Sequence, residues 1–188
     1  MNLREAILGR RSVRSGYTDK PIPQNVLMNI IESGVYAPSG SNSQGVRFLL
    51  MKDKAEIERI GSIRKVPMPG SPKGIVQNAS VLVLVFTETR KGLWSRLPYQ
   101  DSAAAIQNML LTATAHGVAS CWISAYLEMD GTQYMSGETW ADTLASYDIP
   151  DDLEIMGVVM LGYADNMSGD LIHHGRPVAR GAVEGYLL

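Results

Sequence analysis

The chain has 188 residues, of which 45% are hydrophobic and 19% charged, and this composition excludes an intrinsically disordered chain, a coiled coil and a collagen-like repeat. Seventeen Lys and Arg against nineteen Asp and Glu give a formal charge of −2, so no basic excess favours nucleic acid or anionic lipid. The longest apolar run, Val81–Phe86, is too short to span a bilayer, and the N-terminus has no apolar signal core. A single cysteine, Cys121, excludes an intrachain disulfide framework and fits a reducing compartment. We therefore expect one cytoplasmic domain over residues 1–188, with no nucleic-acid or membrane partner.

Hydrophobic periodicity and turn residues predict alternating helices and strands. In chain order, the sequence predicts a helix over 2–9, a helix over 23–33, a strand over 48–51, a helix over 54–60, a strand over 81–86, a helix over 101–115, a strand over 118–124, a helix over 139–146 and a strand over 155–161. Gly34 should end the second helix. The run Val81–Phe86 has no polar alternation, which is typical of a strand covered on both faces. Residues 67–74 predict an irregular loop and residues 162–188 an extended tail, so the fold class is α+β in one domain.

The densest positive cluster lies at residues 10–14, which read Arg-Arg-Ser-Val-Arg. Guanidinium groups match phosphate oxygens in a fork geometry, and the hydroxyl of Ser12 adds another donor. The alternative interpretation is a solvated basic turn after a helix, where cations also complement the helix C-terminus. The cluster alone leaves both interpretations open.

A run of small polar residues follows the second predicted helix. Residues 37–44 read Ala-Pro-Ser-Gly-Ser-Asn-Ser-Gln, and the hydroxyls with the amides of Asn42 and Gln44 can read the edge of a planar heterocycle. Such a run is also typical of an ordinary surface loop. The run and the basic cluster together, in this order and spacing, are more specific than either alone.

Two further patches complete a pattern that covers nearly the whole chain. Asp101–Asn108 leads to Gly117–Ile123, and Gly162-Tyr163 is followed by Gly175-Arg176-Pro177. With these four patches in order, the chain resembles the FMN-dependent nitroreductase family. The resemblance implies a three-layer α+β fold with a central mixed sheet flanked by helices. It also implies an intertwined homodimer with FMN sites at the subunit interface.

The same resemblance implies the activity. Members of the family use NADH or NADPH to reduce a nitroaromatic, a quinone or a similar electron-poor small molecule by ping-pong hydride transfer through flavin N5. One alternative is a flavin-binding or redox-sensing protein without turnover. Another is a specialised family reaction such as reductive dehalogenation. The sequence does not choose the acceptor or the nicotinamide.

The residues that match the family's motifs are expected to hold the cofactor. The resemblance assigns the phosphate and ribityl chain to Arg10, Arg11, Ser12 and Arg176, with His174 beside them. It assigns the N1–O2 edge of the ring to Arg14, where a fixed cation stabilises the anionic reduced flavin. It assigns contacts from the other subunit to Pro38, Ser39, Gly40, Asn42 and Gln44, a backbone N–H toward N5 to Ser124 and Ala125, and the pyrimidine edge to Lys73. No side chain is expected to be a catalytic acid or base, and His173 and His174 lack partners at metal-ligand spacing, so we expect no metal site.

The chain departs from the family at residues 45–47. Family members commonly follow Asn-Ser-Gln with Pro-Trp, whereas this chain has Gly45-Val46 and then Arg47, which is either a surface cation or a contact for an acidic substrate. Trp94 and Tyr99 are expected either to cover the substrate or to lie in the dimer interface. Cys121 is expected to be a buried small hydrophobe rather than a nucleophile.

Overall fold

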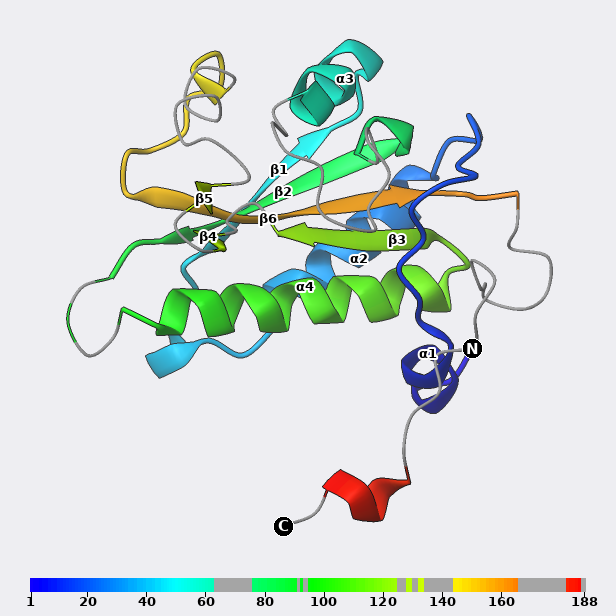
Figure 1. Ribbon diagram of the computed structural model, residues 1–188, viewed down its shortest axis with the longest axis horizontal. Helices are drawn as coiled ribbons and strands as arrows, with labels where there is room; N and C mark the ends of the chain where they lie inside the picture. The colour runs from blue at the N-terminus through cyan, green and yellow to red at the C-terminus, as the bar shows by residue number, and fades with distance from the viewer. Residues whose placement is uncertain are drawn as a thin grey trace.

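The computed structural model describes residues 1–62, 76–90, 92, 95–124, 128–129, 132–133, 144–165 and 182–186 (Figure 1). Its elements in chain order are α1 (Leu3–Gly9), α2 (Gln24–Val35), the short 3-10 helix η1 (Gly40–Asn42), β1 (Val46–Met51), α3 (Lys54–Ser62), η2 (Val76–Asn78), β2 (Val81–Glu88), α4 (Leu97–Ala115), β3 (Ala119–Ser124), β4 (Glu128–Met129), β5 (Thr132–Gln133), β6 (Leu153–Gly162) and η4 (Val183–Tyr186).

The centre of the molecule is a four-stranded sheet in the order β1-β2-β6-β3. All three of its strand pairings are antiparallel. Parallel pairing occurs in the described residues as a single bridge between Ser12 and Ser120, at the outer edge of β3. The sequence predicts a mixed sheet. The four described strands pair only in the antiparallel sense, and the bridge between Ser12 and Ser120 is the parallel pairing among the described residues.

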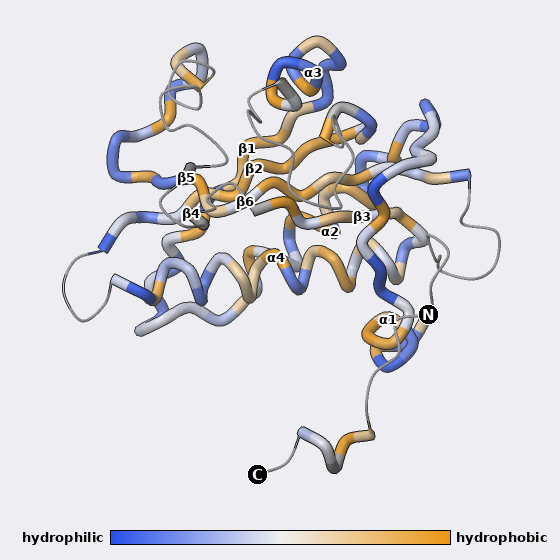
Figure 2. Tube along the Cα trace, in the orientation of Figure 1, coloured by the Kyte–Doolittle hydropathy of each residue, from blue (hydrophilic) through white to orange (hydrophobic). Residues whose placement is uncertain are grey.

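Helices cover both faces of the sheet, as the unbroken apolar run in β2 predicts. Side chains alternate along a strand, so Val83 packs with residues of α2 and α4, whereas the next residue, Leu84, packs with residues of α3. Figure 1 shows α2 and α4 on one face and α3 on the other, and Figure 2 shows the apolar strands between them. This arrangement confirms the three-layer α+β fold.

Two predicted helix boundaries are wrong for tertiary reasons. The helix α2 continues through Gly34 to Val35. A Cβ atom at Gly34 would lie 2.9 Å from Cζ of Phe48 and 3.0 Å from Cγ of Met109, so the glycine allows α2 to approach β1 and α4 closely. The helix α4 begins at Leu97 rather than Asp101, with a proline in its first turn, where the missing N–H costs nothing.

Other predicted elements fall partly outside the described residues. These are the irregular loop over 67–74, most of the predicted helix over 139–146 and most of the tail after residue 165. Within the described residues, no helix combines the length and apolar character needed to cross a membrane.

Candidate functional site

The basic segment, residues 10–14, runs along the outer edge of β3. It leaves α1 at Gly9, and the backbone N–H of Val13 donates to the carbonyl of Ser120 at 2.9 Å. The hydroxyl of Tyr17 donates to the carbonyl of Val13 at 2.8 Å, which fixes the far end of the segment. Backbone bonds and the Tyr17 hydroxyl therefore anchor the segment beside β3.

Arg11 has a mixed role in this segment. Its Nη1 atom donates to the carbonyl of Leu8 at 2.7 Å and to that of Arg10 at 2.8 Å, which supports the end of α1 as the helix-terminus interpretation predicts. Its Nε atom is buried and has no hydrogen-bond partner among the described residues. A buried donor without a partner is costly and points to an acceptor outside the described residues.

The other three polar residues of the segment all act electrostatically on Cys121. Burial raises the pKa of the Cys121 thiol, while Arg14, a hydrogen bond from Ser12 and the charge of Arg10 each lower it. Burial also raises the pKa of Tyr17, and the same Arg14 opposes that shift. The thiol itself is 0% exposed, which confirms the predicted buried small hydrophobe. Arg10, Ser12 and Arg14 therefore lie within electrostatic reach of one point on β3.

The outer edge of β3 also offers backbone groups. The carbonyl of Ser120 points away from β6, because it accepts a hydrogen bond from the basic segment. Backbone groups of an antiparallel strand point alternately toward and away from the neighbouring strand. Trp122 and Ser124 therefore direct their N–H groups to the same outer edge, away from β6, and Trp122 is 39% exposed. This is consistent with the predicted backbone donor at Ser124.

The polar loop, residues 38–44, adopts an unusual backbone. Ser41, Asn42 and Gln44 have φ values of 55°, 52° and 51°, in the left-handed region that costs a non-glycine residue free energy. The loop closes on itself, because the Gln44 N–H donates to Oγ of Ser39 at 2.9 Å and Nε2 of Gln44 donates to Oδ1 of Asn42 at 3.2 Å. These bonds give the loop one defined conformation, unlike an ordinary surface turn.

A buried carboxylate attaches the loop to α4. The Gly40 N–H donates to Oδ1 of Asp101 at 2.8 Å, and the Ser43 hydroxyl donates to Oδ2 at 3.3 Å. Asp101 is 6% exposed, and it lines a cavity of about 160 Å³ behind the loop together with Val46. The family's Trp is replaced by Val46, so this space lies beside the position where the bulky ring is missing.

Arg47 supports the other end of the loop. Its Nη1 atom donates to the carbonyl of Gln44 at 2.7 Å, and its Nη2 atom forms an ion pair with Glu88 at 3.0 Å. Both charged side chains are partly exposed. The geometry favours the surface-cation interpretation of Arg47 over a contact for an acidic substrate.

The basic segment and the polar loop lie at opposite ends of α4 (Figure 1). The loop is attached near the N-terminal end of α4 at Asp101, and the segment lies beside Ser120, shortly after the helix ends. At 1.5 Å per residue, about 20 Å of helix axis separates Asp101 from the end of α4. The two groups of one chain therefore cannot hold the same phosphate.

Comparison with known proteins identifies the family. The model described as "Nitroreductase family" matches residues 7–73 and 71–163. The chain belongs to the nitroreductase family. Over 161 residues it is 27% identical to "Putative NADH dehydrogenase/NAD(P)H nitroreductase" of Archaeoglobus fulgidus, covering 84% of this chain and 82% of that protein.

Two solved structures extend the likeness to nearly the full length. A nitroreductase with bound FMN from Bacteroides fragilis is 30% identical, with a TM-score of 0.67 and coverage of 97% of this chain and 95% of that chain. A "putative nitroreductase in complex with fmn" from Desulfovibrio desulfuricans is 26% identical, with a TM-score of 0.71 and coverage of 99% and 95%. These likenesses confirm the family and the nitroreductase fold predicted from the four sequence patches.

Several predicted site residues lie outside the described residues. They are Lys73, Ala125, His174 and Arg176, together with Trp94 and His173, while Ser124 is described in its backbone only. Sequence reasoning also missed Asp101 as an anchor of the loop. The available signal was a carboxylate at the start of an apolar helical stretch, since a buried carboxylate requires hydrogen-bond donors.

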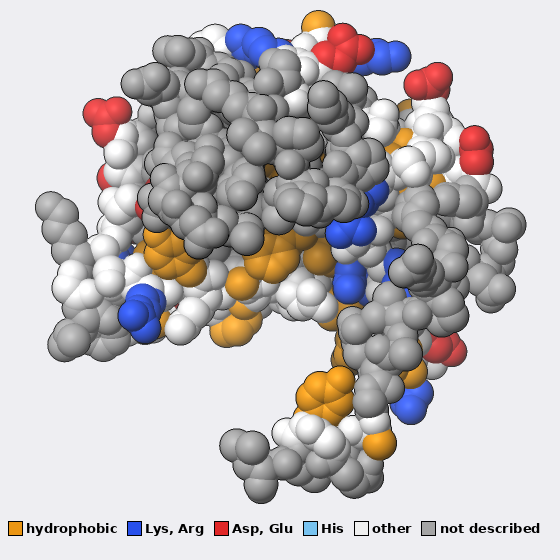
Figure 3. Space-filling view, viewed as in Figure 1, with side chains coloured by type: hydrophobic (Ala, Val, Ile, Leu, Met, Phe, Trp, Pro, Cys, Tyr) orange, Lys and Arg blue, Asp and Glu red, His pale blue; other side chains and the backbone are white. Residues whose placement is uncertain are grey.

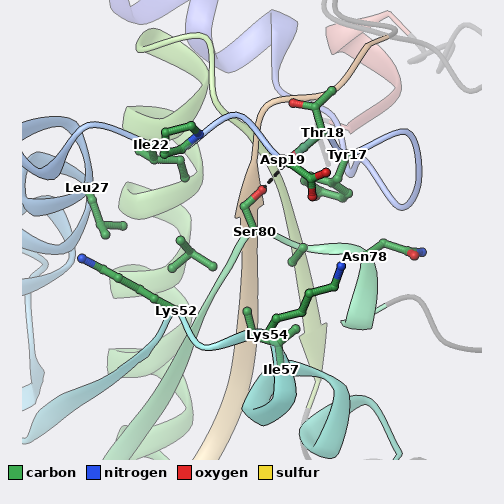
Figure 4. Close-up of a pocket in the computed structure, with 13 residues that line it drawn as sticks. Tyr17, Thr18, Asp19, Ile22, Leu27, Lys52, Lys54, Ile57, Asn78 and Ser80 are labelled. Carbon is green, nitrogen blue, oxygen red and sulfur yellow. Dashed lines mark hydrogen bonds between the residues drawn. The ribbon is translucent and has the colours of Figure 1, made fainter.

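A larger cavity of about 570 Å³ lies between the segment 17–22 and the turn from β1 to α3 (Figure 4). Its polar groups hold its own walls together: Lys52 Nζ donates to Oε1 of Gln24 at 2.7 Å, and the Ser80 hydroxyl donates to the carbonyl of Thr18 at 3.0 Å. None of residues 10–14 lines it. It meets the basic segment at Tyr17, whose hydroxyl donates to the carbonyl of Val13.

Proposed function

We propose that this protein is an FMN-dependent oxidoreductase that uses NADH or NADPH to reduce a nitroaromatic, a quinone or a similar electron-poor small molecule. Family membership and the relatives named NAD(P)H nitroreductase support the reaction class. The FMN-bound relatives support the cofactor. The observation that carries the proposal is that the outer edge of β3 holds the basic segment, in which the buried Nε of Arg11 has no acceptor among the described residues.

The donors of the basic segment fit the phosphate of FMN. A phosphate monoester is close to a dianion at neutral pH, so one cation would leave it under-compensated. Arg10 and Arg11 supply two guanidinium groups, and the buried Nε of Arg11 lacks an acceptor among the described residues. In this assignment, Arg176 adds a third cation, and the hydroxyl of Ser12 contacts the ribityl chain.

The ring of the cofactor would lie along the edge of β3. The backbone N–H of Ser124 would orient the ring at N5, and Arg14 would hold a positive charge at the N1–O2 edge. When bound, FMN supplies the hydride-transfer chemistry, first with the nicotinamide and then with the acceptor. The protein itself would bind the cofactor, orient its ring and stabilise its negative charge. No side chain is assigned as a proton donor or acceptor.

The cofactor sites would be shared between two chains. The basic segment and the polar loop lie at opposite ends of α4, so a complete site needs the loop of a second copy. On α1, the side chains of Leu3, Ile7 and Leu8 are 68%, 52% and 56% exposed, although they are apolar. Figure 3 shows further apolar side chains facing the hollow between the body and the segment 182–186. A second copy that covers these surfaces would bury more than ~2,000 Å² in an obligate dimer.

Sedimentation at low micromolar concentration, with and without FMN, tests the shared site. We expect a dimer that carries two FMN molecules. A stable monomer with stoichiometric flavin would overturn the shared site and leave the reaction class untouched.

Analysis of the bound chromophore and its reduction tests the reaction. Mass spectrometry of the released chromophore should give FMN, and FAD or no flavin would contradict the proposal. Anaerobic titration with NADH and NADPH should bleach the flavin absorbance, and a panel of acceptors should restore it. Bound FMN that neither nicotinamide reduces would favour a flavin-binding protein without turnover.

A further inference from the structure

We infer that Asp101 is the positioning residue of the polar loop and that it serves the cofactor site of the opposite subunit. The inference rests on the proposed function, since it concerns how this chain completes its partner's FMN site. Asp101 touches no cofactor in this account. It acts through the loop that it holds.

The contacts make Asp101 the link between the loop and α4. Both of its carboxylate oxygens accept hydrogen bonds from the loop, one from the Gly40 N–H at 2.8 Å and one from the Ser43 hydroxyl at 3.3 Å. Among the described residues it has no ion-pair partner. A buried carboxylate that is not paired with a cation depends on such donors, so the loop and the carboxylate stabilise each other.

The strained backbone of the loop explains why an anchor is needed. Three residues, Ser41, Asn42 and Gln44, hold positive φ values that a free loop would leave. The bonds of Ser39 and Asn42 to Gln44 lie within the loop, so they do not fix its position on the body. Without Asp101, the described attachments that remain are the bond from Arg47 and the close approach of the loop to Leu97.

The anchored conformation leaves donors for a partner. Oγ of Ser39 accepts a hydrogen bond from Gln44, so its own hydrogen remains available for donation. Oδ1 of Asn42 accepts a hydrogen bond from Nε2 of Gln44, and the Nδ2 group of Asn42 is a donor. Both residues belong to the set expected to contact the cofactor of the other subunit. Asp101 thus controls the direction of donors that it does not itself contribute.

Three variants separate positioning from simple loss of stability. Asp101→Ala removes both acceptors, and we expect FMN to bind the dimer about tenfold more weakly. Asp101→Asn keeps one acceptor for Gly40, and its amide can donate to the Ser43 hydroxyl, so it should restore most of the affinity. Asp148→Ala removes an exposed carboxylate elsewhere and should bind FMN as the wild type does.

The decisive experiment is a mixed dimer of an Asp101→Ala chain with an Arg10→Ala chain, isolated with two different tags and titrated with FMN. If Asp101 serves the opposite site, one site carries both lesions and the other carries none. The mixed dimer then binds one FMN with wild-type affinity. If Asp101 acted on its own chain's site, each site would carry one lesion and no wild-type site would remain.

The outcomes distinguish this inference from the proposed function. A wild-type dimer that binds no FMN overturns the proposed function and the inference with it. A wild-type dimer that binds FMN, with an Asp101→Ala homodimer that binds it equally well, overturns the inference alone. If Asp101→Ala does not fold, Ser43→Ala, which removes one of the two bonds, takes its place in the mixed dimer with the same two expected patterns.

Discussion

The basic segment and the polar loop are held in opposite ways. A backbone bond between Val13 and Ser120 holds the segment on β3, and Arg11 adds side-chain bonds to the carbonyls of Leu8 and Arg10. Side chains hold the loop, above all Asp101, and its own backbone is strained. A substitution in the segment should therefore change the charge that a ligand meets, whereas a substitution under the loop should change geometry.

The largest effect is expected from charge removal in the segment. Arg10→Ala should weaken FMN binding about 10- to 100-fold, because hydrogen bonds to charged groups contribute about 1.5–3 kcal/mol. The free energy of unfolding without FMN should change less than the free energy of FMN binding, since the backbone bond of Val13 to Ser120 remains. Fluorescence titration of the apoprotein with FMN measures the affinity, and urea denaturation measures the stability.

Arg59→Ala is the matched control for Arg10→Ala. It removes the same charge from α3, where Arg59 lies over the ring of Tyr147. Its FMN affinity should equal that of the wild type. Equal losses in the two variants would show that net charge, rather than a phosphate site, determines binding.

A geometric change under the loop should have a smaller effect. A Cβ atom at Gly40 would lie 2.5 Å from Cδ1 of Leu97, so Gly40→Ala should push the loop away from α4. We expect FMN to bind up to about tenfold more weakly, since overpacking costs about 1–3 kcal/mol and Leu97 can partly move aside. The same titration measures it.

The double variant Gly40→Ala with Leu97→Ala tests the cause. Removing the Leu97 side chain makes room for the new methyl group, so the double variant should bind FMN more tightly than Gly40→Ala alone. Additive losses would mean that the contact between Gly40 and Leu97 does not set the position of the loop.

The sequence predicts much of the fold because the apolar patterns are strong. An unbroken run such as Val81–Phe86 needs cover on both faces, and the structure supplies α3 on one side and α2 with α4 on the other. The errors arise where a residue's role depends on distant partners. Glycine is typical of a helix end, so the sequence predicts that α2 stops at Gly34. In the structure Gly34 lies inside α2, where the absence of a Cβ atom allows close contact with Phe48 and Met109.

The cations of the candidate site can be predicted from the sequence, whereas the residue that anchors the polar loop cannot. Arg10, Ser12 and Arg14 are close together in the chain, so a local pattern shows them. Asp101 meets Gly40, a residue 61 positions earlier, and no local pattern connects the two. The sequence also does not predict what covers the apolar residues of α1. A single chain leaves them exposed, and hydrophobic periodicity carries no information about a partner.

The smallest effect, and the sharpest test of the segment, is expected at Arg14. Burial raises the pKa of both Cys121 and Tyr17, and the charge of Arg14 opposes both shifts, so Arg14 acts at the β3 edge where the ring is proposed to lie. A cation there stabilises the reduced, negatively charged form of the cofactor, and its removal should make the midpoint potential more negative. An interaction of about 1.4 kcal/mol corresponds to about 30 mV for a two-electron couple. Arg14→Ala should show this shift by anaerobic redox titration while retaining FMN.

The control variant Arg14→Lys keeps the charge, so its midpoint potential should stay close to that of the wild type. An unchanged potential in Arg14→Ala, with full FMN occupancy, would mean that Arg14 does not face the ring and that the segment contributes to phosphate binding alone.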